Sequence, residues 1–546
     1  MGYVVYQGNT RNAYDDECVR RKKAVSGEDR APTKPVIEAH DVIVELLRKE
    51  RVGEQSGERP EADQPVYVLS DRSISGKLDL KHRTVEVAVY IQGCEFLDEV
   101  DLRYCEFKQA VNFSDCTFRK HFNSGDEYES HTIYRKDLNC NGAVFEGPFG
   151  FNGGRVEGSA YFYKTRFLDE ERPVDFAWAS VERTLEFQDT FFKGRAIFTD
   201  LKCGGGFFRD ATFEGEADFS YASFGGNLDC TGATFGAKAS FNTLECGGSG
   251  FFNPCTFEGE ADFKFASFGV NLTCIGARFA GPVDLSAARV SRGLQLDAAT
   301  FEQQVTLYQT KIGLLSIGDA LPFRESSYAD LRECSFEGFG GDAKVARDLA
   351  KKQQPDLFSR DPYLQLEKYY RGVGNEVEAK RMHFLGRSEL RKNAISRDGH
   401  TKWPPATMLG DACLWLLTGY GVRTWRLVVP IFFFLIVGTW VFWPAGALEP
   451  KASGTTGASN GVQAGEVYLA SAQPNGEQSQ GDLGEHLSDR VLYSLDLFLP
   501  VVNLHVDENW SPEGLGREIY AAFHSLVGWV LVPLLLASLA GIIRRE

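Results

Sequence analysis

Several signatures of metal and nucleotide chemistry are missing from this sequence. Its 12 cysteines form no Cys-x-x-Cys pair, and its 9 histidines form no His-Glu-x-x-His motif. A Gly-x-x-x-x-Gly-Lys-Ser/Thr loop is also absent. These absences argue against a zinc ribbon, a zinc-protease motif and a P-loop nucleotide site. Acidic residues outnumber basic ones: the net charge of −16 argues against general binding of nucleic acid or of anionic lipid by the whole chain, while local patches can differ.

The first residues, MGYVVYQGNTRNAYDDE, contain no apolar stretch of signal-peptide length. Met1-Gly2 does not complete a myristoylation motif, because Tyr6 stands where Ser or Thr is required. We therefore expect cysteines that are reduced in the cytosol rather than paired in disulfides. Methionine is scarce too, with 3 residues against 41 phenylalanines and 56 glycines, which favours a patterned, Phe-filled fold over a helical one.

The dominant feature is an internal repeat of eleven residues. From Ala217 the chain reads ADFSY ASFGGN LDCTG ATFGAK ASFNT LECGGS, with five- and six-residue units in alternation. Two ladders of large residues recur at this spacing, beside a ladder of small residues that includes Ala211, Ala222 and Ala233. We predict that the three ladders form the interior. The phenylalanines of the first ladder are Phe213, Phe224, Phe235, Phe257, Phe268, Phe279 and Phe301, and those of the second are Phe208, Phe219, Phe241, Phe252 and Phe263.

This pattern resembles the pentapeptide-repeat family, in which a small residue and a Phe or Leu two positions later point inward on each face of a right-handed, quadrilateral β-helix. The resemblance implies a mainly β fold with roughly 22 residues per coil. The repeat covers residues 93–319, interrupted at Phe122–Asp137 and Leu168–Pro173, which gives roughly ten coils. We assign residues 1–92 to a tail, an amphipathic helix at Val36–Glu50 and a cap, because a solenoid end exposes strand edges.

Two side-chain sets on this solenoid have alternative interpretations. Cysteines on the ladders, such as Cys94 and Cys230, are interpreted as buried packing residues rather than redox or metal groups. Acidic tracts resembling GEAD predict either a calcium-binding ladder or an acidic solvated surface. Their carboxylates are Glu214, Glu216, Asp218, Glu258, Glu260 and Asp262.

Helix-forming composition replaces the strand pattern after Ala343. Residues 363–392, YLQLEKYYRGVGNEVEAKRMHFLGRSELRK, predict a helix, a glycine-containing turn and a second helix. This hairpin resembles one tetratricopeptide-like unit, which is too little for a peptide-binding array. We assign 320–404 to a linker and helical neck that acts as a spacer or in oligomerisation. Seven basic residues against two acidic ones between Lys380 and Lys402 indicate a solvated face or contact with lipid headgroups.

Two apolar segments, 427–448 and 519–543, predict transmembrane helices. The segment between them is acidic, with eleven acidic and three basic residues from Leu448 to Glu518. Basic residues flank the spans on the other side: Arg423 and Arg426 before the first, Arg544 and Arg545 after the second. The positive-inside rule therefore predicts a two-pass protein with both termini in the cytoplasm and 449–518 outside.

Residues 405–426 are predicted as a juxtamembrane amphipathic segment. Their TGYG tetrad resembles a potassium-channel filter, but a filter lies between two spans, whereas this tetrad precedes the first. We interpret the glycines as a turn. The predicted membrane-interface anchors are Arg423, Trp425, Arg426, Trp510, Arg544 and Arg545.

Within the external region, residues 490–510 predict an amphipathic helix too short to span. It either lies at the interface or dips into the membrane as pore helices do. In the second case the mouth or filter groups are Asp496, Asn503, His505, Asp507 and Glu508. His524 in the second span is a functional candidate because it is membrane-embedded, with a merely solvated or hydrogen-bonded ring near the external interface as the alternative.

Four stretches together resemble a bacterial class of membrane-anchored pentapeptide-repeat proteins: ISGKLDL, the neck hairpin, GYGVRTWR and YSLDLFLPVVNLHVDENWSP. The resemblance implies the bacterial inner membrane. Members are often labelled membrane-associated oxidoreductases. The nearest approach to a dinucleotide fingerprint here, GFGGDA at Gly338, follows CSFE and lacks the expected downstream acid. We therefore expect no cofactor and no enzymatic activity.

Three functions remain open from the sequence. The first is a scaffold or receptor that binds an unidentified cytoplasmic protein through flat β faces. The second is a divergent two-helix ion channel or membrane effector gated by the solenoid, which requires a homo-oligomer. The third is an acidic rod that mimics DNA, as in pentapeptide-repeat proteins that protect gyrase.

Overall fold

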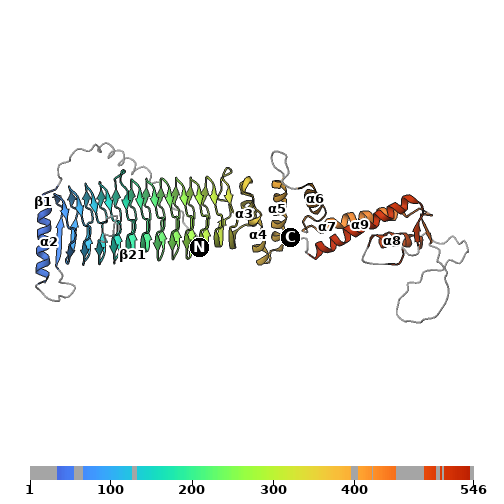
Figure 1. Cartoon of the computed structure of the whole chain (residues 1–546), viewed down its shortest axis with the longest axis horizontal. Helices are drawn as coiled ribbons and strands as arrows, with labels where there is room; N and C mark the ends of the chain where they lie inside the picture. Colours follow the sequence, from blue (N-terminus) through green and yellow to red (C-terminus); the bar gives the residue numbers. More distant parts are fainter. Residues whose placement is uncertain are drawn as a thin grey trace, which may run out of the picture. The chain divides into compact units, whose positions relative to one another are not determined.

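The computed structural model describes residues 34–54, 65–125, 132–394, 404–420, 422–444, 446–450, 485–499, 504–506 and 510–540. The chain divides into two compact units, Met1–Lys352 and Gln353–Glu546. The first unit is a parallel β-solenoid and the second is helical (Figure 1).

The solenoid has about twelve coils, and its strands form three long sheets. One sheet of twelve strands runs from β1 (Val36–Glu38) to β40 (Thr300–Phe301), and a second runs from β4 (Leu78–Asp79) to β43 (Ala329–Asp330). The third sheet has twenty strands and supplies two faces. Long strands such as β21 (Ser180–Glu186) cross the corner between those faces, since β21 pairs with both β17 (Arg155–Val156) and β18 (Ala160–Tyr161).

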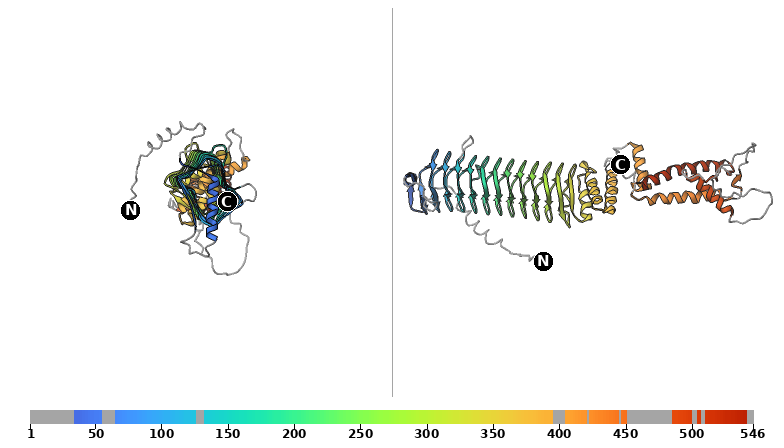
Figure 2. Two further views of the ribbon diagram at one scale, coloured as in Figure 1. Left: turned by 90° about the vertical axis from the view of Figure 1, so that its left-hand side faces the viewer. Right: turned by 90° about the horizontal axis from the view of Figure 1, so that it is seen from below.

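Neighbouring coils are in parallel register about 22 residues apart, as predicted. Thr234 pairs with Thr256, and Thr256 pairs with Arg278. The spacing lengthens at the two predicted insertions, where Thr117 pairs with Val144 and Arg166 with Phe191. The stacked coils are seen from the side in the right panel of Figure 2.

The interior is filled by phenylalanine rings. A column of rings runs along the β1–β40 sheet from Phe96 to Phe323, and successive centroids lie 4.6 to 5.3 Å apart. This distance matches the spacing of neighbouring strands, so the ladder pitch follows from the backbone. Every predicted ladder phenylalanine is at most 1% exposed: Phe208, Phe213, Phe219, Phe224, Phe235, Phe241, Phe252, Phe257, Phe263, Phe268, Phe279 and Phe301.

The ladder cysteines share this interior. The described cysteines are free thiols, and Cys94 and Cys230 are among those that are buried. Burial raises the pKa of the Cys274 thiol to about 12. Such thiols carry little thiolate at neutral pH, so packing accounts for their positions.

The coils extend beyond the predicted range 93–319 at both ends. At the start, β2 (Val66–Ser70) already pairs with β6 (Ala88–Gln92). At the end, β44 (Ser335–Gly341) pairs with β42 (Lys311–Gly318), so part of the predicted linker belongs to the last coil. These outer strands are longer than the two-residue strands of the regular repeat, so the eleven-residue pattern is interrupted before the coils end and the number of coils was underestimated.

A helix follows the strands at each end of the solenoid. The predicted helix at Val36–Glu50 begins as strand β1, and α2 (Ala39–Glu54) follows it and buries Ala39, Val42 and Leu46. At the other end, α3 (Ala343–Lys351) packs against β44, and the N–H of Ala329 donates to the carbonyl of Lys352. Both helices cover strand edges that would otherwise be open.

The helical unit begins with the predicted hairpin. Helices α4 (Asp361–Gly372) and α5 (Glu376–Ala394) are joined at Gly374, which has a φ of 78°. The buried His383 ring lies 3.0 Å from the buried Glu367 carboxylate. Burial opposes ionisation of Glu367, but this contact and nearby arginines outweigh it and hold its pKa below the usual range.

Helix α6 (Pro405–Thr418) ends at Gly419, whose φ is 54°, before α7 (Trp425–Val441) begins. The first predicted span is therefore shorter than 427–448, because the chain leaves the helix after Val441 and enters β45 (Leu448–Pro450). Strand β45 pairs antiparallel with β46 (Trp510–Pro512).

In the described part of the chain, one helix is long and apolar enough to cross a membrane, α9 (Leu515–Leu539). It begins four residues before the predicted segment 519–543. Helix α7 is a shorter apolar helix. The predicted helix 490–510 is α8 (Glu485–Phe498), which ends shortly before Pro500, since a residue that precedes proline disfavours helical geometry.

Candidate functional site

Aromatic side chains project from one corner of the solenoid, at the turn after the strands of the β4–β43 sheet. Trp178, Tyr221 and Phe265 are 59%, 59% and 60% exposed. Their backbone N–H groups donate to the next coil at equivalent places, for example Phe265 to the carbonyl of Ser286 at 2.9 Å. We call Trp178, Tyr221 and Phe265 the aromatic corner.

The three residues of the aromatic corner lie on alternate coils. Asp200 and Thr243 occupy the same turn on the coils between them. The backbone N–H of Asp200 donates to the carbonyl of Ser220, next to Tyr221, and the N–H of Thr243 donates to the carbonyl of Lys264, next to Phe265. Two strand spacings separate neighbouring rings, or about 10 Å. The corner therefore presents rings with polar gaps between them.

All three backbones are left-handed, with φ of 54° to 61°. Bulky residues rarely adopt this conformation, which favours Gly, Asn and Asp. The corner after the strands of the neighbouring face mostly follows that preference, since Asp115, Asp189, Asp210, Gly232 and Gly276 occupy left-handed positions there, with Lys164 and Ala298 as exceptions. An exposed ring gains little from packing, so the fold itself does not explain the aromatic corner.

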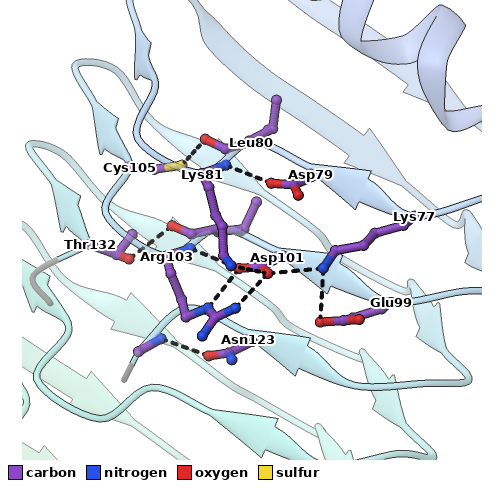
Figure 3. A network of polar contacts seen from close by, with 12 residues as sticks. Lys77, Asp79, Leu80, Lys81, Glu99, Asp101, Arg103, Cys105, Asn123 and Thr132 are labelled. Carbon is purple, nitrogen blue, oxygen red and sulfur yellow. Dashed lines mark hydrogen bonds and ion pairs between the residues drawn. The ribbon is translucent and has the colours of Figure 1, made fainter. Parts of the chain in front are cut away.

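A charged network lies on the β4–β43 sheet near the start of the solenoid (Figure 3). The Asp101 side chain is fully buried, and Arg103, Lys77 and Lys81 contact it at 2.9, 3.1 and 3.2 Å. Burial opposes its ionisation, but these hydrogen bonds and charges outweigh burial and hold the pKa of Asp101 far below its usual range. The network ties two successive strands of the sheet together, β4 and β8 (Val100–Asp101).

Acidic residues of the GEAD tracts accept hydrogen bonds from turn backbone or form ion pairs. Asp218 and Asp262 each accept the backbone N–H two residues later. Glu258 pairs with Arg278 at 2.8 Å and Glu260 with Lys238 at 3.3 Å. Across the described residues, no group of three or more His, Cys, Asp or Glu side chains is arranged to hold a metal ion.

The GFGGDA segment is part of the last coil. Gly338 and Gly340 lie in β44 and pair with Leu314 and Ser316 of β42. Because this backbone is engaged in a strand ladder, the glycines do not form the open loop that a dinucleotide phosphate requires.

Helices α7, α8 and α9 pack against one another in the second unit. One cluster joins Leu427, Phe498 and Leu531, and another joins Phe442, Tyr493 and Ala521. Each cluster takes one residue from α8 and others from the two longer apolar helices or their ends. The short helix is thus an integral part of this three-helix group.

His524 lies at the centre of this packing and is 0% exposed. Its Nε2 lies 3.2 Å from Ser494 Oγ and 3.1 Å from the Ser494 carbonyl oxygen on α8. The Tyr520 hydroxyl lies 3.4 Å from Nδ1. A ring protonated at Nε2 donates to the carbonyl, which can only accept. His524 therefore links α9 to α8 rather than lying in solvent.

Two glycines permit this close approach. A Cβ at Gly438 of α7 would lie 2.3 Å from Ser494 Oγ and 2.7 Å from the His524 ring. A Cβ at Gly528 of α9 would lie 2.0 Å from the Phe498 carbonyl oxygen. Any larger residue at either position would force the helices apart.

Of the five predicted mouth or filter groups, Asp496 and His505 lie in the part of the chain that the structure describes. Asp496 accepts the N–H groups of Leu504 at 2.7 Å and Val506 at 2.8 Å, so its carboxylate closes the segment that follows α8. His505 is exposed in that same segment. Asn503, Asp507 and Glu508 lie outside the described residues.

The predicted anchors also differ in their surroundings. Trp425 is 64% exposed at the start of α7, whereas Trp510 packs on the cluster of Phe442 and Tyr493. Arg423 stacks on the ring of Phe384. Arg426 contacts α6 through the Trp415 carbonyl. Arg544 and Arg545 lie outside the described residues.

No protein-family model, no curated protein and no solved structure matches the chain.

Proposed function

We propose that this chain is a membrane-anchored repeat scaffold that binds a protein partner along its aromatic corner. The observation that supports it is the exposure of Trp178, Tyr221 and Phe265 on left-handed backbone. A left-handed residue with a side chain costs roughly 1–2 kcal/mol. Other residues of this turn, such as Thr243 and Ala287, carry the same cost. What distinguishes the three residues is a large apolar ring left in solvent on alternate coils, which is the mark of residues retained for binding.

The partner is a polypeptide that presents apolar groups between polar ones. Tryptophan and tyrosine are the residues most enriched at the energetic centres of protein interfaces. Asp200 and Thr243 between the rings offer hydrogen-bond acceptors to the partner's backbone. A rigid solenoid holds these groups at a fixed pitch, so little conformational entropy is lost on binding.

The anchor is the helical unit, with α7 and α9 as its two spans. Both helices expose apolar side chains, for example Phe432 and Trp440 on α7 and Leu526 and Trp529 on α9. The basic flanks of the spans and the acidic segment 449–518 favour a cytoplasmic solenoid with both termini inside. In this arrangement the partner is a cytoplasmic protein.

The test uses substitutions that suit the backbone and remove the rings. In full-length protein purified from its native membranes after cross-linking, the Tyr221→Asn/Phe265→Asn variant is expected to lose its partner while its fold is retained. Ala298→Asn is the matched control, because Ala298 has a φ of 55° on a different corner. Equal recovery of the same partner by the wild type, the double variant and Ala298→Asn would refute the proposal.

A second candidate function, an ion channel or membrane effector, is favoured by the packing of α8 against both α7 and α9 around His524. A pore requires several copies, so this function predicts a closed homo-oligomer in detergent and conductance after reconstitution. Ser494→Ala, which removes one contact of His524, is expected to change that conductance, whereas Gly410→Ala on α6 is not. A monomer that conducts nothing would rule this function out.

A further inference from the structure

One face of α6 is apolar and exposed. Leu409 and Leu416 are 69% and 62% exposed, and Ala412 and Cys413 between them are exposed as well. Residues three, four and seven apart share a helix face, so these four form one stripe. The one charged residue of α6, Asp411, accepts the Tyr420 hydroxyl at 2.9 Å. The stripe is thus uncharged.

Three arginines without carboxylate partners lie where α6 meets α5 and α7. Arg391 of α5 stacks on the Trp415 ring at 4.3 Å, Arg423 stacks on Phe384 at 5.0 Å, and Arg426 reaches the Trp415 carbonyl. Among the described residues, no carboxylate lies within ion-pair distance of these three arginines. Aromatic rings and carbonyls hold the guanidinium groups in place but leave their charge uncompensated.

Two other cations of the same hairpin are paired. Arg381 contacts Glu378 at 2.6 Å and Lys392 contacts Glu389 at 2.7 Å. The arginines at the junction of α5, α6 and α7 differ from these two cations in having no carboxylate partner, and the exposed Trp425 begins the apolar α7 at the same place.

We propose that α6 docks on the surface of an anionic phospholipid bilayer, with the Leu409–Leu416 stripe among the acyl chains and Arg391 and Arg423 on lipid phosphates. The apolar stripe supplies hydrophobic binding and the arginines supply charge complementarity to anionic headgroups. The surface is continuous with the proposed span α7, so membrane insertion places α6 at the headgroup level. Anionic lipid thereby controls how α6 sits against the membrane.

This inference rests on the membrane anchoring of the proposed function, and one experiment tests both. Cys413 is the exposed cysteine among the described residues, so a nitrobenzoxadiazole maleimide labels α6 once Cys18 is replaced by serine. The labelled full-length protein is reconstituted into phosphatidylcholine vesicles with and without phosphatidylglycerol. Quenching by doxyl-labelled acyl chains then reports the insertion of α6.

We expect deeper quenching in the phosphatidylglycerol vesicles and a decrease with added salt. Arg391→Gln/Arg423→Gln should reduce the lipid-dependent partition of α6 by about fivefold per arginine, or roughly 30-fold for the pair. Arg381→Gln/Lys392→Gln removes the same charge from paired residues and should behave as wild type.

Quenching that is equal in both lipids, or that both double variants lose alike, would overturn the inference. Protein that alkaline carbonate extracts from the vesicles would instead overturn the membrane anchoring itself. Insertion without dependence on phosphatidylglycerol thus contradicts the lipid-docking inference alone.

Discussion

The ring of Phe257 stacks on that of Phe235, one coil away, with centroids 4.7 Å apart and 8° between their planes. Phe257 makes the same contact with Phe279 on the other side, at 4.8 Å. Each ring of the column is therefore held by the coils on both sides. Removing one ring affects three coils, because a solenoid is stabilised by contacts between neighbouring repeats.

We predict that Phe257→Ala destabilises these coils by about 3–5 kcal/mol, and Phe257→Leu by roughly 1–1.5 kcal/mol. Amide hydrogen exchange of the full-length protein should show faster exchange in β29 (Thr234–Phe235), β33 (Thr256–Phe257) and β37 (Arg278–Phe279). Exchange in distant coils should be unchanged. Uniform acceleration along the solenoid would contradict the local character of the contact.

The Asp101 network predicts a pH dependence. The folded-state pKa of Asp101 is depressed, so its contribution to stability is complete above the ordinary carboxyl pKa of about 4 and is lost as the pH falls below it. Asp101→Asn leaves three cations around an uncharged group and should cost about 2–3 kcal/mol at pH 7. Urea unfolding of the solenoid signal from pH 7 to pH 3 measures both effects.

Asp79→Asn is the matched control for this network. Asp79 is exposed on the preceding coil and accepts the N–H of Lys81, which an asparagine oxygen accepts as well. Its substitution should change the free energy of unfolding by less than about 0.5 kcal/mol. A loss equal to that of Asp101→Asn would mean that the buried network is not special.

Phe265→Asn should stabilise the solenoid. Phe265 has a φ of 58° and a 60% exposed side chain, so asparagine removes backbone strain and little burial. The expected gain is roughly 0.5–1 kcal/mol, measured as an upward shift of the thermal midpoint. A stabilised variant that no longer binds its partner would show that the Phe265 ring destabilises the fold and serves binding. A destabilised variant would mean that the ring serves the fold.

Gly438→Ala should separate α7 from α8 and α9. The added methyl group would meet Ser494 Oγ and the His524 ring, and overpacking of this kind costs about 1–3 kcal/mol. Gly410→Ala in α6 is the control, because nothing lies within 4 Å of its Cβ position. The midpoint of thermal unfolding in detergent, followed by tryptophan fluorescence, should be lowered by Gly438→Ala and not by Gly410→Ala.

The repeat frame could be predicted because each ladder position repeats the same environment. The eleven-residue period placed Phe213 and Phe219 inside and predicted the 22-residue coil. The ends were missed for the converse reason: β2 and β44 lie where coils meet α2 and α3, so the environment changes and the residue types change with it. The helix boundary at Val36 was set by the pairing of β1 with β3 (Ser73–Ser75), which no local pattern carries.

The aromatic corner is visible in the sequence as three aromatic residues at one position of the repeat. Trp178, Tyr221 and Phe265 occupy a repeat position where the turn favours Asp, Gly or Asn, so each departs from the preference of its turn. The contact of His524 with Ser494 had no such signal. The two residues are thirty positions apart in different helices, and hydropathy assigns each to its helix without relating one to the other.

The sequence was sufficient to determine the parallel solenoid, its pitch and its phenylalanine interior, because a period of eleven residues maps directly onto repeated backbone geometry. It also located the apolar helices. Only the tertiary structure decided which rings face solvent, that Asp101 gathers three cations, and that Gly438, Ser494 and His524 meet. Those relationships join elements whose separation follows no period, so they depend on how the chain packs rather than on any local pattern.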